Sequence, residues 1–158
     1  MTRVVVADSG PLIALARLEL LSLLGQLFDE VQVPHAVFAE CVARPDLADA
    51  RQIQAAADAG AFQLCDTQPV DAPGLDAGES HAIGRALEIG AALLADDRAA
   101  RRYARERQLV VIGTLGVLVR AKRQSLLPAV RPLIERLRAS GHHLSEAATV
   151  EALGAANE

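Results

Sequence analysis

Short apolar runs, each followed by polar residues, glycine or proline, alternate along this chain with longer helical patterns. Residues 3–7 form the first run, which stops at Asp8, and Ser9-Gly10-Pro11 then supplies capping residues with a proline at a first helical position. Runs of this length that alternate with helices favour a parallel sheet with right-handed crossovers. The pattern therefore predicts an α/β fold with helices on both faces of the sheet.

The pattern predicts five strands, at residues 3–7, 30–33, 61–65, 92–95 and 109–112. Helical patterns cover residues 11–24, 36–43, 46–58, 76–88, 98–107, 114–123, 128–139 and 145–153. Asp46 is the expected cap of the third of these helices. We expect the last three helices to cover a sheet edge or to contact a partner.

The composition predicts one domain with an aliphatic core. The 158 residues are 51% hydrophobic but only 3% aromatic, and no Gly/Ser/Pro-rich linker divides them. Cys41 and Cys65 lie in apolar surroundings without metal-ligand spacing, which predicts buried free thiols in a reducing compartment. Asp8 interrupts the first apolar run and Gly113 breaks the longest one, so we expect a cytoplasmic protein without an export signal or a transmembrane helix.

The charge is distributed unevenly along the chain. A net charge of -4 and a pI of 5.6 would ordinarily argue against nucleic-acid binding. However, residues 98–138 hold most of the basic side chains, and only Glu106 and Glu135 oppose them. This segment is either a set of solvated helix faces or a phosphate-binding surface beside an acidic site.

Acidic residues follow two of the predicted strands. Asp8 ends the first strand, and Asp96-Asp97 end the fourth. Functional groups of open parallel sheets collect at the carboxyl ends of the strands, especially where the chain winds outward in both directions. Carboxylates that meet there repel one another unless a cation neutralises them, and a hard divalent ion suits oxygen ligands.

Each acidic residue also has an ordinary structural explanation. Asp8 could cap the following helix, and Asp97, or its neighbour Asp96, could cap the next. Glu40 precedes Arg44 by four residues, the spacing of a surface ion pair. Glu79 follows Asp76 by three residues, the spacing of a capping box.

Taken together, five segments resemble the PIN-domain nucleases, which include bacterial VapC-type toxins. More narrowly, they resemble the PIN subgroup long catalogued as a domain of unknown function. The resemblance covers residues 3–140, and its matching segments are Val-Ala-Asp8-Ser-Gly-Pro-Leu-Ile-Ala-Leu, Val-Pro-His-Ala-Val-Phe-Ala-Glu40, Leu-Asp-Ala-Gly-Glu79-Ser-His-Ala-Ile, Leu-Glu-Ile-Gly-Ala-Ala-Leu-Leu-Ala-Asp96-Asp97-Arg-Ala-Ala-Arg and Val-Ile-Gly-Thr-Leu-Gly-Val-Leu-Val-Arg-Ala-Lys.

The resemblance implies a three-layer α/β/α fold with strand order 3-2-1-4-5 and extra C-terminal helices. Residues 1–140 would form the nuclease domain, and residues 141–158 a helical tail of the same domain. The catalytic acids implied are Asp8, Glu40, Glu79 and Asp97; Asp97 is preferred to Asp96 because its separation from Glu79 is similar to that in VapC-type relatives.

The resemblance also implies one or two Mg²⁺ or Mn²⁺ ions. Asp8, Glu79 and Asp97 would be ligands, Asp96 a further candidate ligand, and Glu40 would act through a water. Two departures from the family pattern matter: Glu79 stands where Asp is frequent, and Ala95 where Thr or Ser is frequent. Ser9 or Thr114 could supply the missing hydroxyl that supports the ligands.

The activity implied is endoribonucleolytic cleavage of RNA, with the protein acting as the toxin of a toxin–antitoxin pair. A small antitoxin and a second copy of the chain would be its partners. The helix after Asp97 would hold the RNA backbone without sequence readout, through Arg98, Arg101, Arg102 and Arg105. His81 could face the pocket, although a position on the helix surface is expected.

Other functions remain open at this stage. A PIN fold can bind RNA or a partner without cleaving it. A receiver-like signalling domain shares the β/α alternation, and Asp66 resembles its phosphoacceptor, but the acidic pair after strand one and the lysine after strand five are missing. A haloacid-dehalogenase-type phosphatase would need Asp-x-Asp-x-Thr, whereas the segment at Asp8 has a single acid.

Overall fold

The computed structural model describes residues 3–158. Strand β1 (Val4–Ala7) lies at the centre of a five-stranded parallel sheet, between β2 (Glu30–Pro34) and β4 (Ala92–Leu94). Strands β3 (Gln63–Cys65) and β5 (Val111–Ile112) form the edges. The order β3-β2-β1-β4-β5 confirms the expected fold, although both edge strands are shorter than expected. A receiver-like domain would have the order 2-1-3-4-5, which this sheet excludes.

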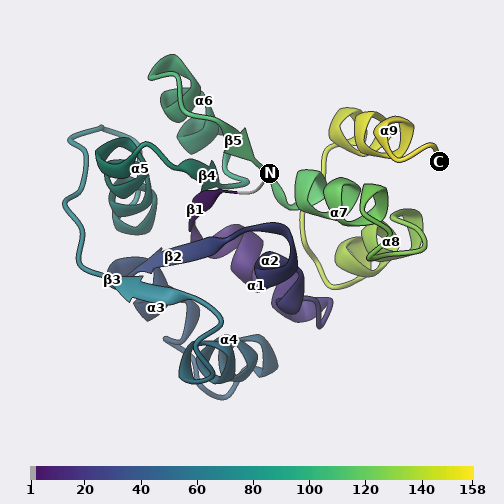
Figure 1. Cartoon of the computed structure of the whole chain (residues 1–158), viewed down its shortest axis with the longest axis horizontal. Coiled ribbons are helices and arrows are strands. Elements are labelled where there is room, and N and C mark those ends of the chain that lie inside the picture. The colour runs from purple at the N-terminus through teal and green to yellow at the C-terminus, as the bar shows by residue number, and fades with distance from the viewer. Residues whose placement is uncertain (1–2) are drawn as a thin grey trace.

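Helices cover both faces of the sheet (Figure 1). Helices α5 and α6 lie on one face, α1, α2 and α7 lie on the other, and α4 packs on α1. The described helices are α1 (Ser9–Arg17), α2 (Ser22–Leu27), α3 (His35–Cys41), α4 (Ala48–Asp58), α5 (Ala77–Ile89), α6 (Arg98–Glu106), α7 (Thr114–Arg123), α8 (Arg131–Ala139) and α9 (Glu146–Ala155).

The core is aliphatic because the central strands are covered on both sides. Val5 and Val6 of β1 and Leu93 and Leu94 of β4 are completely buried. An apolar run without polar alternation is the expected pattern for such strands. Cys41 is buried as expected, whereas Cys65 is only half-buried because it lies in the edge strand β3; both are free thiols.

Two local predictions need correction. The helical pattern over residues 11–24 is divided, because Glu19 adopts a left-handed backbone conformation (φ 59°) between α1 and α2. Asp46 is not the cap of α4: Leu47 occupies that position, and the Asp46 carboxylate instead accepts a hydrogen bond from Arg44 at 3.0 Å.

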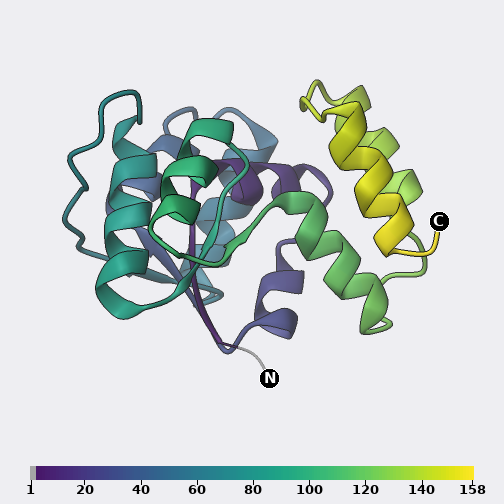
Figure 2. The same ribbon diagram turned by 90° about the horizontal axis from the view of Figure 1, so that it is seen from above.

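Helices α8 and α9 pack beside the sheet rather than on it (Figure 2). Helix α7 follows β5 and contacts α1 and α2, and α9 packs on α7. The Glu158 carboxylate accepts hydrogen bonds from the backbone N–H groups of Val130 and Arg131, at the start of α8. Within residues 3–158, no helix has the length and apolar character needed to cross a membrane.

Candidate active site

Asp8 is a buried carboxylate at the carboxyl end of β1. Its backbone N–H donates to the Leu94 carbonyl at 2.9 Å, which holds it beside β4, and the residue is only 5% exposed. Asp8 occupies the N-cap position of α1, but its side chain makes no capping hydrogen bond, and its Oδ1 has no hydrogen-bond partner. The capping explanation for this side chain therefore fails.

The surroundings of Asp8 disfavour its charge. The pKa of Asp8 is raised to about 7, mainly by burial and also by the nearby carboxylates of Asp76, Glu79 and Glu40, against the opposing effect of the Ser9 backbone N–H. Several acids thus act on one buried carboxylate. This arrangement is typical of a site that binds a cation or shares a proton.

The other acids come from α3 and from the start of α5. Glu40 Oε1 accepts a hydrogen bond from the Gly78 backbone N–H at 3.2 Å, so Glu40 does not form the expected surface pair with Arg44. Asp76 and Glu79 form a complete capping box at the start of α5. Burial raises the pKa of Glu79, and Asp76 and Asp97 contribute to that rise. We call Asp8, Glu40, Asp76, Glu79 and Asp97 the acidic cluster.

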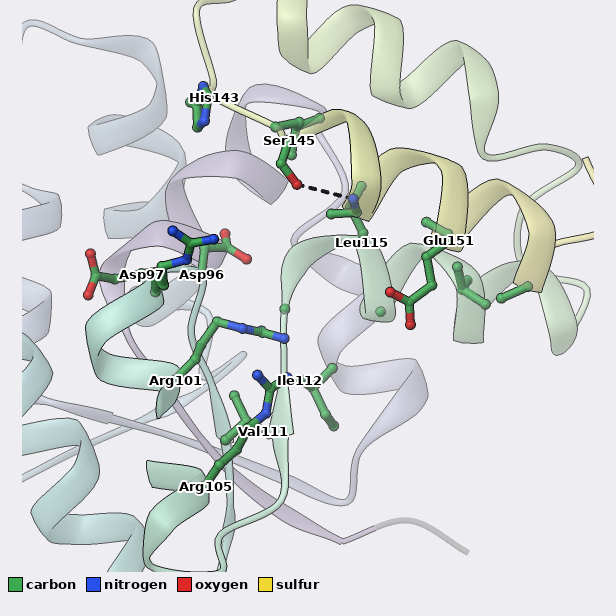
Figure 3. Close-up of a pocket in the computed structure, with 18 of the residues that line it drawn as sticks. Asp96, Asp97, Arg101, Arg105, Val111, Ile112, Leu115, His143, Ser145 and Glu151 are labelled. Carbon is green, nitrogen blue, oxygen red and sulfur yellow. Dashed lines mark hydrogen bonds between the residues drawn. The ribbon is translucent and has the colours of Figure 1, made fainter. Parts of the chain in front are cut away.

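The consecutive residues Asp96 and Asp97 point in different directions (Figure 3). Asp97 caps α6, with Oδ2 accepting from the Ala100 N–H at 2.9 Å. Asp96 turns toward α7: its Oδ1 accepts from the Thr114 N–H at 2.8 Å, and its Oδ2 accepts from the Thr114 hydroxyl at 2.6 Å. His142 Nε2 lies 3.8 Å from the same Asp96 Oδ2. Asp96 therefore joins β4 to α7 and to the segment before α9.

The donor chemistry of the acidic cluster fits a hard divalent cation. Carboxylate oxygens are the ligands that Mg²⁺ and Mn²⁺ prefer, and Asp8 Oδ1 is a buried acceptor without a partner. In residues 3–158, no group of three or more His, Cys, Asp or Glu side chains is already arranged to hold a metal ion. Glu40, Asp76, Glu79 and Asp97 instead accept backbone N–H groups.

A cavity of about 1250 Å³ lies beside Asp96 and Asp97, between α6, β5, α7 and the segment 142–155. Six arginines from α6 and α7 line one side of it, and we call this cavity the arginine groove. Arg101 is half-buried, whereas the other five are exposed. Its Nη1 donates to the Ala95 carbonyl at 2.8 Å, and burial, together with Arg105, lowers its pKa. The six are Arg98, Arg101, Arg102, Arg105, Arg120 and Arg123.

Comparison with known proteins identifies the family. The family described as DUF3368, a PIN domain, matches residues 4–158. This chain belongs to the PIN-domain family. Among solved structures, it is similar to the PilT N-terminus domain protein SSO1118 from the archaeon Sulfolobus solfataricus, with 17% identity, a TM-score of 0.55, and coverage of 75% of this chain and 92% of that chain.

A second similar structure is PAE2754 from Pyrobaculum aerophilum, with 19% identity, a TM-score of 0.55, and coverage of 76% of this chain and 97% of that chain. At these identities the likeness concerns the fold of the PIN domain. No curated protein sequence matches this chain significantly.

The PIN fold brings the four predicted acids to one edge of the sheet. Glu40 and Glu79 act electrostatically on Asp8, and Asp97 acts on Glu79. The predicted arginines of α6 line the adjacent groove. Thr114 lies beside an acidic side chain as predicted, but that side chain is Asp96.

Ser9 and His81 are the two other residues considered for the site, and for His81 a position on the helix surface was expected. Ser9 acts on Asp8 through its backbone N–H. His81 Nδ1 lies 2.7 Å from the Thr67 hydroxyl, and His81 does not line the arginine groove.

Sequence reasoning missed several residues near the candidate site. Asp76 was considered only as a cap, yet it is the first of the carboxylates that raise the pKa of Asp8. Its signal was the capping box itself, which places two acids together at one helix start. Arg120, Arg123 and His142 reach the groove only because α7 and α9 pack together, and no local pattern reveals that contact.

Proposed function

We propose that this PIN domain is a metal-dependent endoribonuclease that hydrolyses RNA phosphodiester bonds at the acidic cluster. The observation that carries the proposal is Asp8, a buried carboxylate with an unpartnered oxygen and with three other acids acting on it. A carboxylate that served only structure would be hydrogen-bonded or exposed, because burying an unpaired charge is costly.

The residues of the cluster would take different roles. Asp8 and Asp97 would bind the cation directly from the ends of β1 and β4, and Glu79 would bind it directly or through a water. Glu40, exposed at the end of α3 and hydrogen-bonded to α5, would orient a water. Asp96 is the weaker candidate for a ligand because both of its oxygens already accept hydrogen bonds from Thr114.

A bound Mg²⁺ or Mn²⁺, as one or two ions, would supply an activated water and neutralise charge that develops on the phosphate. The arginines of α6 would hold the RNA backbone beside Asp97, and their contacts would give affinity without sequence readout. Cleavage would leave a 5′-phosphate and a 3′-hydroxyl.

The test is a cleavage assay on single-stranded RNA with Mn²⁺ or Mg²⁺. We expect cleavage by the wild type and losses of at least about 100-fold for Asp8→Asn and Asp97→Asn. Asp29→Asn is the matched control, because Asp29 is exposed and directly precedes β2, at the opposite end of the strands from Asp8. Equal cleavage by all four proteins would mean contamination and would remove the proposal.

A PIN domain that binds RNA or a partner without cleaving it is the second candidate. One observation favours it: carboxylates of the acidic cluster already accept hydrogen bonds from backbone N–H groups instead of being arranged around a metal ion. These are the carboxylates of Glu40, Asp76, Glu79 and Asp97. RNA binding by the wild type, with no cleavage at any Mn²⁺ or Mg²⁺ concentration, would select this function.

We further propose that the protein is the cytoplasmic toxin of a toxin–antitoxin pair and acts as a homodimer. Support comes from the family membership and from the exposed apolar side chains of Leu126 and Val150 in the C-terminal part of the chain. Co-expression with the product of a small adjacent gene should relieve any growth arrest, and light scattering should give the mass of two chains. A monomer, or arrest that no neighbouring product relieves, would contradict these assignments.

A further inference from the structure

Helix α5 begins at the acidic cluster, and backbone N–H groups at its start bind three of the cluster's carboxylates. The N–H of Asp76 donates to Glu79 Oε2 at 3.0 Å, and the N–H of Glu79 donates to Asp76 Oδ1 at 2.8 Å. The N–H of Gly78 donates to Glu40 Oε1 at 3.2 Å. In this arrangement, the partial positive charge of the helix N-terminus offsets part of the repulsion between the carboxylates.

The cluster is not arranged around a cation in this conformation. Among residues 3–158, no group of three or more His, Cys, Asp or Glu side chains has a geometry that could hold a metal ion. Asp8 Oδ1 is nevertheless a buried acceptor without a partner, in a residue that is only 5% exposed. Other carboxylates must therefore move if a cation at Asp8 is to gain further protein ligands.

The bond from the Asp76 N–H to Glu79 is the least costly of these bonds to lose. Asp76 is exposed, so water can replace the Glu79 carboxylate as the acceptor of this N–H. Gly78 is buried, so loss of its bond to Glu40 would leave a donor that water reaches poorly. The N–H group that donates to Asp97 belongs to a buried residue as well. Glu79 is therefore the carboxylate of the cluster that moves most easily.

Helix α5 keeps its position when this one bond is lost. The side chain of Asp76 still accepts from the Glu79 N–H, so the helix start remains capped. Figure 1 shows the loop over residues 66–75, which leads from β3 to α5. Within this loop, the Val70 N–H donates to the Ser80 carbonyl of α5 at 3.1 Å. The change is thus confined to one side chain.

We propose that Glu79 exchanges the backbone N–H of Asp76 for the divalent cation, while the Asp76 side chain keeps α5 capped. The proposal rests on the proposed function, since the cation is the one assigned to the acidic cluster. Asp76 is then a positioning residue with two opposed effects. Its N–H withholds Glu79 from the cation, and its carboxylate preserves the helix start when Glu79 leaves.

Amide hydrogen exchange of the full chain, measured by NMR without RNA, tests the exchange of partners. Spectra are compared in EDTA and in Mg²⁺, which is diamagnetic. We expect Mg²⁺ to speed exchange of the Asp76 N–H by at least about threefold, because its acceptor changes from a carboxylate to water. The N–H groups of Glu79 and Gly78 should stay protected, because their bonds to Asp76 and Glu40 remain.

Two variants of residue 76 isolate the effect of its N–H. Asp76→Pro and Asp76→Ala both lose the capping carboxylate, but only proline also lacks the N–H. The φ of -77° at Asp76 lies in the range that proline adopts. Because nothing then withholds Glu79, Asp76→Pro should bind Mn²⁺ about three- to tenfold more tightly than Asp76→Ala. The EPR signal of free Mn²⁺ measures this binding in the absence of RNA.

The same comparison in a Glu79→Gln background is the matched control. Glutamine can accept the Asp76 N–H but is a poorer ligand for a hard cation, so the proline and alanine variants should then bind Mn²⁺ equally. Melting temperatures check that each variant is folded. If Asp76→Pro does not fold, the exchange measurement on the wild type decides.

Unchanged exchange of the Asp76 N–H in Mg²⁺ would overturn the proposal, as would equal Mn²⁺ affinities of Asp76→Pro and Asp76→Ala; either result leaves the cation site in place. The absence of Mn²⁺ binding to the wild type and to every variant would overturn both this proposal and the metal-dependent nuclease. The expected exchange and affinities without RNA cleavage would support the movement of Glu79 and reject the enzyme.

Discussion

Asp8 combines burial, an unpartnered oxygen and neighbouring negative charge. An isolated buried charge destabilises a fold, and proteins usually avoid it by pairing the group or by keeping it neutral. A pKa of about 7 for Asp8 means that the protein without a bound cation carries this unfavourable charge at neutral and alkaline pH. The position is thus costly for stability, which is the usual sign of a functional residue.

Replacing Asp8 by Asn should stabilise the metal-free protein. The folded pKa of about 7 lies above the ordinary value of 3.8, so the charge does not penalise folding below pH 3.8 and penalises it fully above pH 7. We expect Asp8→Asn to raise the free energy of unfolding by about 2–4 kcal/mol in EDTA at pH 8, and by less at pH 5. Urea denaturation of both proteins at the two pH values measures this.

Added Mn²⁺ should stabilise the wild type more than the Asp8→Asn variant. A cation bound by Asp8 stabilises the folded wild type by mass action, so added Mn²⁺ should raise its melting temperature more than that of Asp8→Asn. A wild type that is more stable than the variant in EDTA at pH 8 would contradict the burial argument.

The direction in which an individual side chain points could not be predicted from the sequence. Asp8 could be placed because a strand end fixes its position. Asp96 and Asp97 are neighbours at another strand end, and their roles depend on which helix N-terminus each carboxylate reaches. The Asp96 bond to Thr114 joins residues eighteen positions apart, so no local pattern could assign it.

The start of α5 holds the carboxylate of Glu40, which belongs to α3, in place. Glu40 of α3 accepts the Gly78 N–H, and a Cβ on residue 78 would lie 2.5 Å from Glu40 Oε1. Only glycine allows this approach. Gly78→Ala should therefore displace Glu40 and raise the Mn²⁺ concentration for half-maximal RNA cleavage by about tenfold, as loss of supporting contacts does at metal sites.

Stability should separate this effect from unfolding. Alanine favours a helix over glycine by up to about 1 kcal/mol, and the Glu40 side chain is exposed and can move. The melting temperature of Gly78→Ala should therefore stay the same or rise. Gly25→Ala in α2, where an added Cβ meets nothing within 4 Å, is the control and should leave the Mn²⁺ dependence unchanged.

The contact between β4 and α7 depends on the Thr114 hydroxyl. Thr114 is completely buried, and its Oγ1 donates to Asp96 Oδ2 at 2.6 Å. Thr114→Val keeps the shape but removes this donor, so we expect a loss of about 1–3 kcal/mol in the free energy of unfolding. Thr67→Val, at a half-buried site, should cost less. Additive effects of Thr114→Val and Asp96→Asn in a double-mutant cycle would show that the two residues do not interact.

Elements were predictable where the chain carries strong local signals. The central strands could be located from uninterrupted apolar runs, and α5 from its capping box and its C-terminal Gly90. The break between α1 and α2 at Glu19 could not be predicted, because no sequence pattern indicates a glutamate in the left-handed backbone conformation. The edge strands were predicted too long because their pairing partners, rather than their composition, set their length.

At the scale of the whole molecule, the packing of the C-terminal helices distinguishes between the two explanations for the basic segment, residues 98–138. Sequence left two explanations open for its arginines, and the packing of α9 on α7 encloses six of them in one cavity. Arg136, by contrast, is exposed on α8 outside this cavity. The distinction depends on tertiary contacts between helices that follow β5, so charge counting along the chain could not make it.

Glu158 joins the three C-terminal helices and should make their packing sensitive to acid. Its carboxylate accepts bonds from Val130 N–H at 2.6 Å, Arg131 N–H at 3.1 Å and Lys122 Nζ at 3.0 Å. These bonds, first that from Val130, lower the pKa of Glu158 from 4.5 to about 2. The charged form therefore stabilises the folded chain fully above pH 4.5, and this contribution disappears as the pH falls through about 2.

Replacing Glu158 by Gln tests this, because the amide keeps the size of the side chain but removes its charge. We expect Glu158→Gln to unfold at lower urea concentration than the wild type at pH 5 and above, since charge-assisted bonds to a helix N-terminus and to Lys122 are lost. The difference should shrink between pH 4.5 and pH 2 as the wild-type carboxylate becomes protonated. Glu135→Gln on the exposed side of α8 should match the wild type throughout. A gap between wild type and Glu158→Gln that is independent of pH would mean that shape, rather than charge, holds α8 at this position.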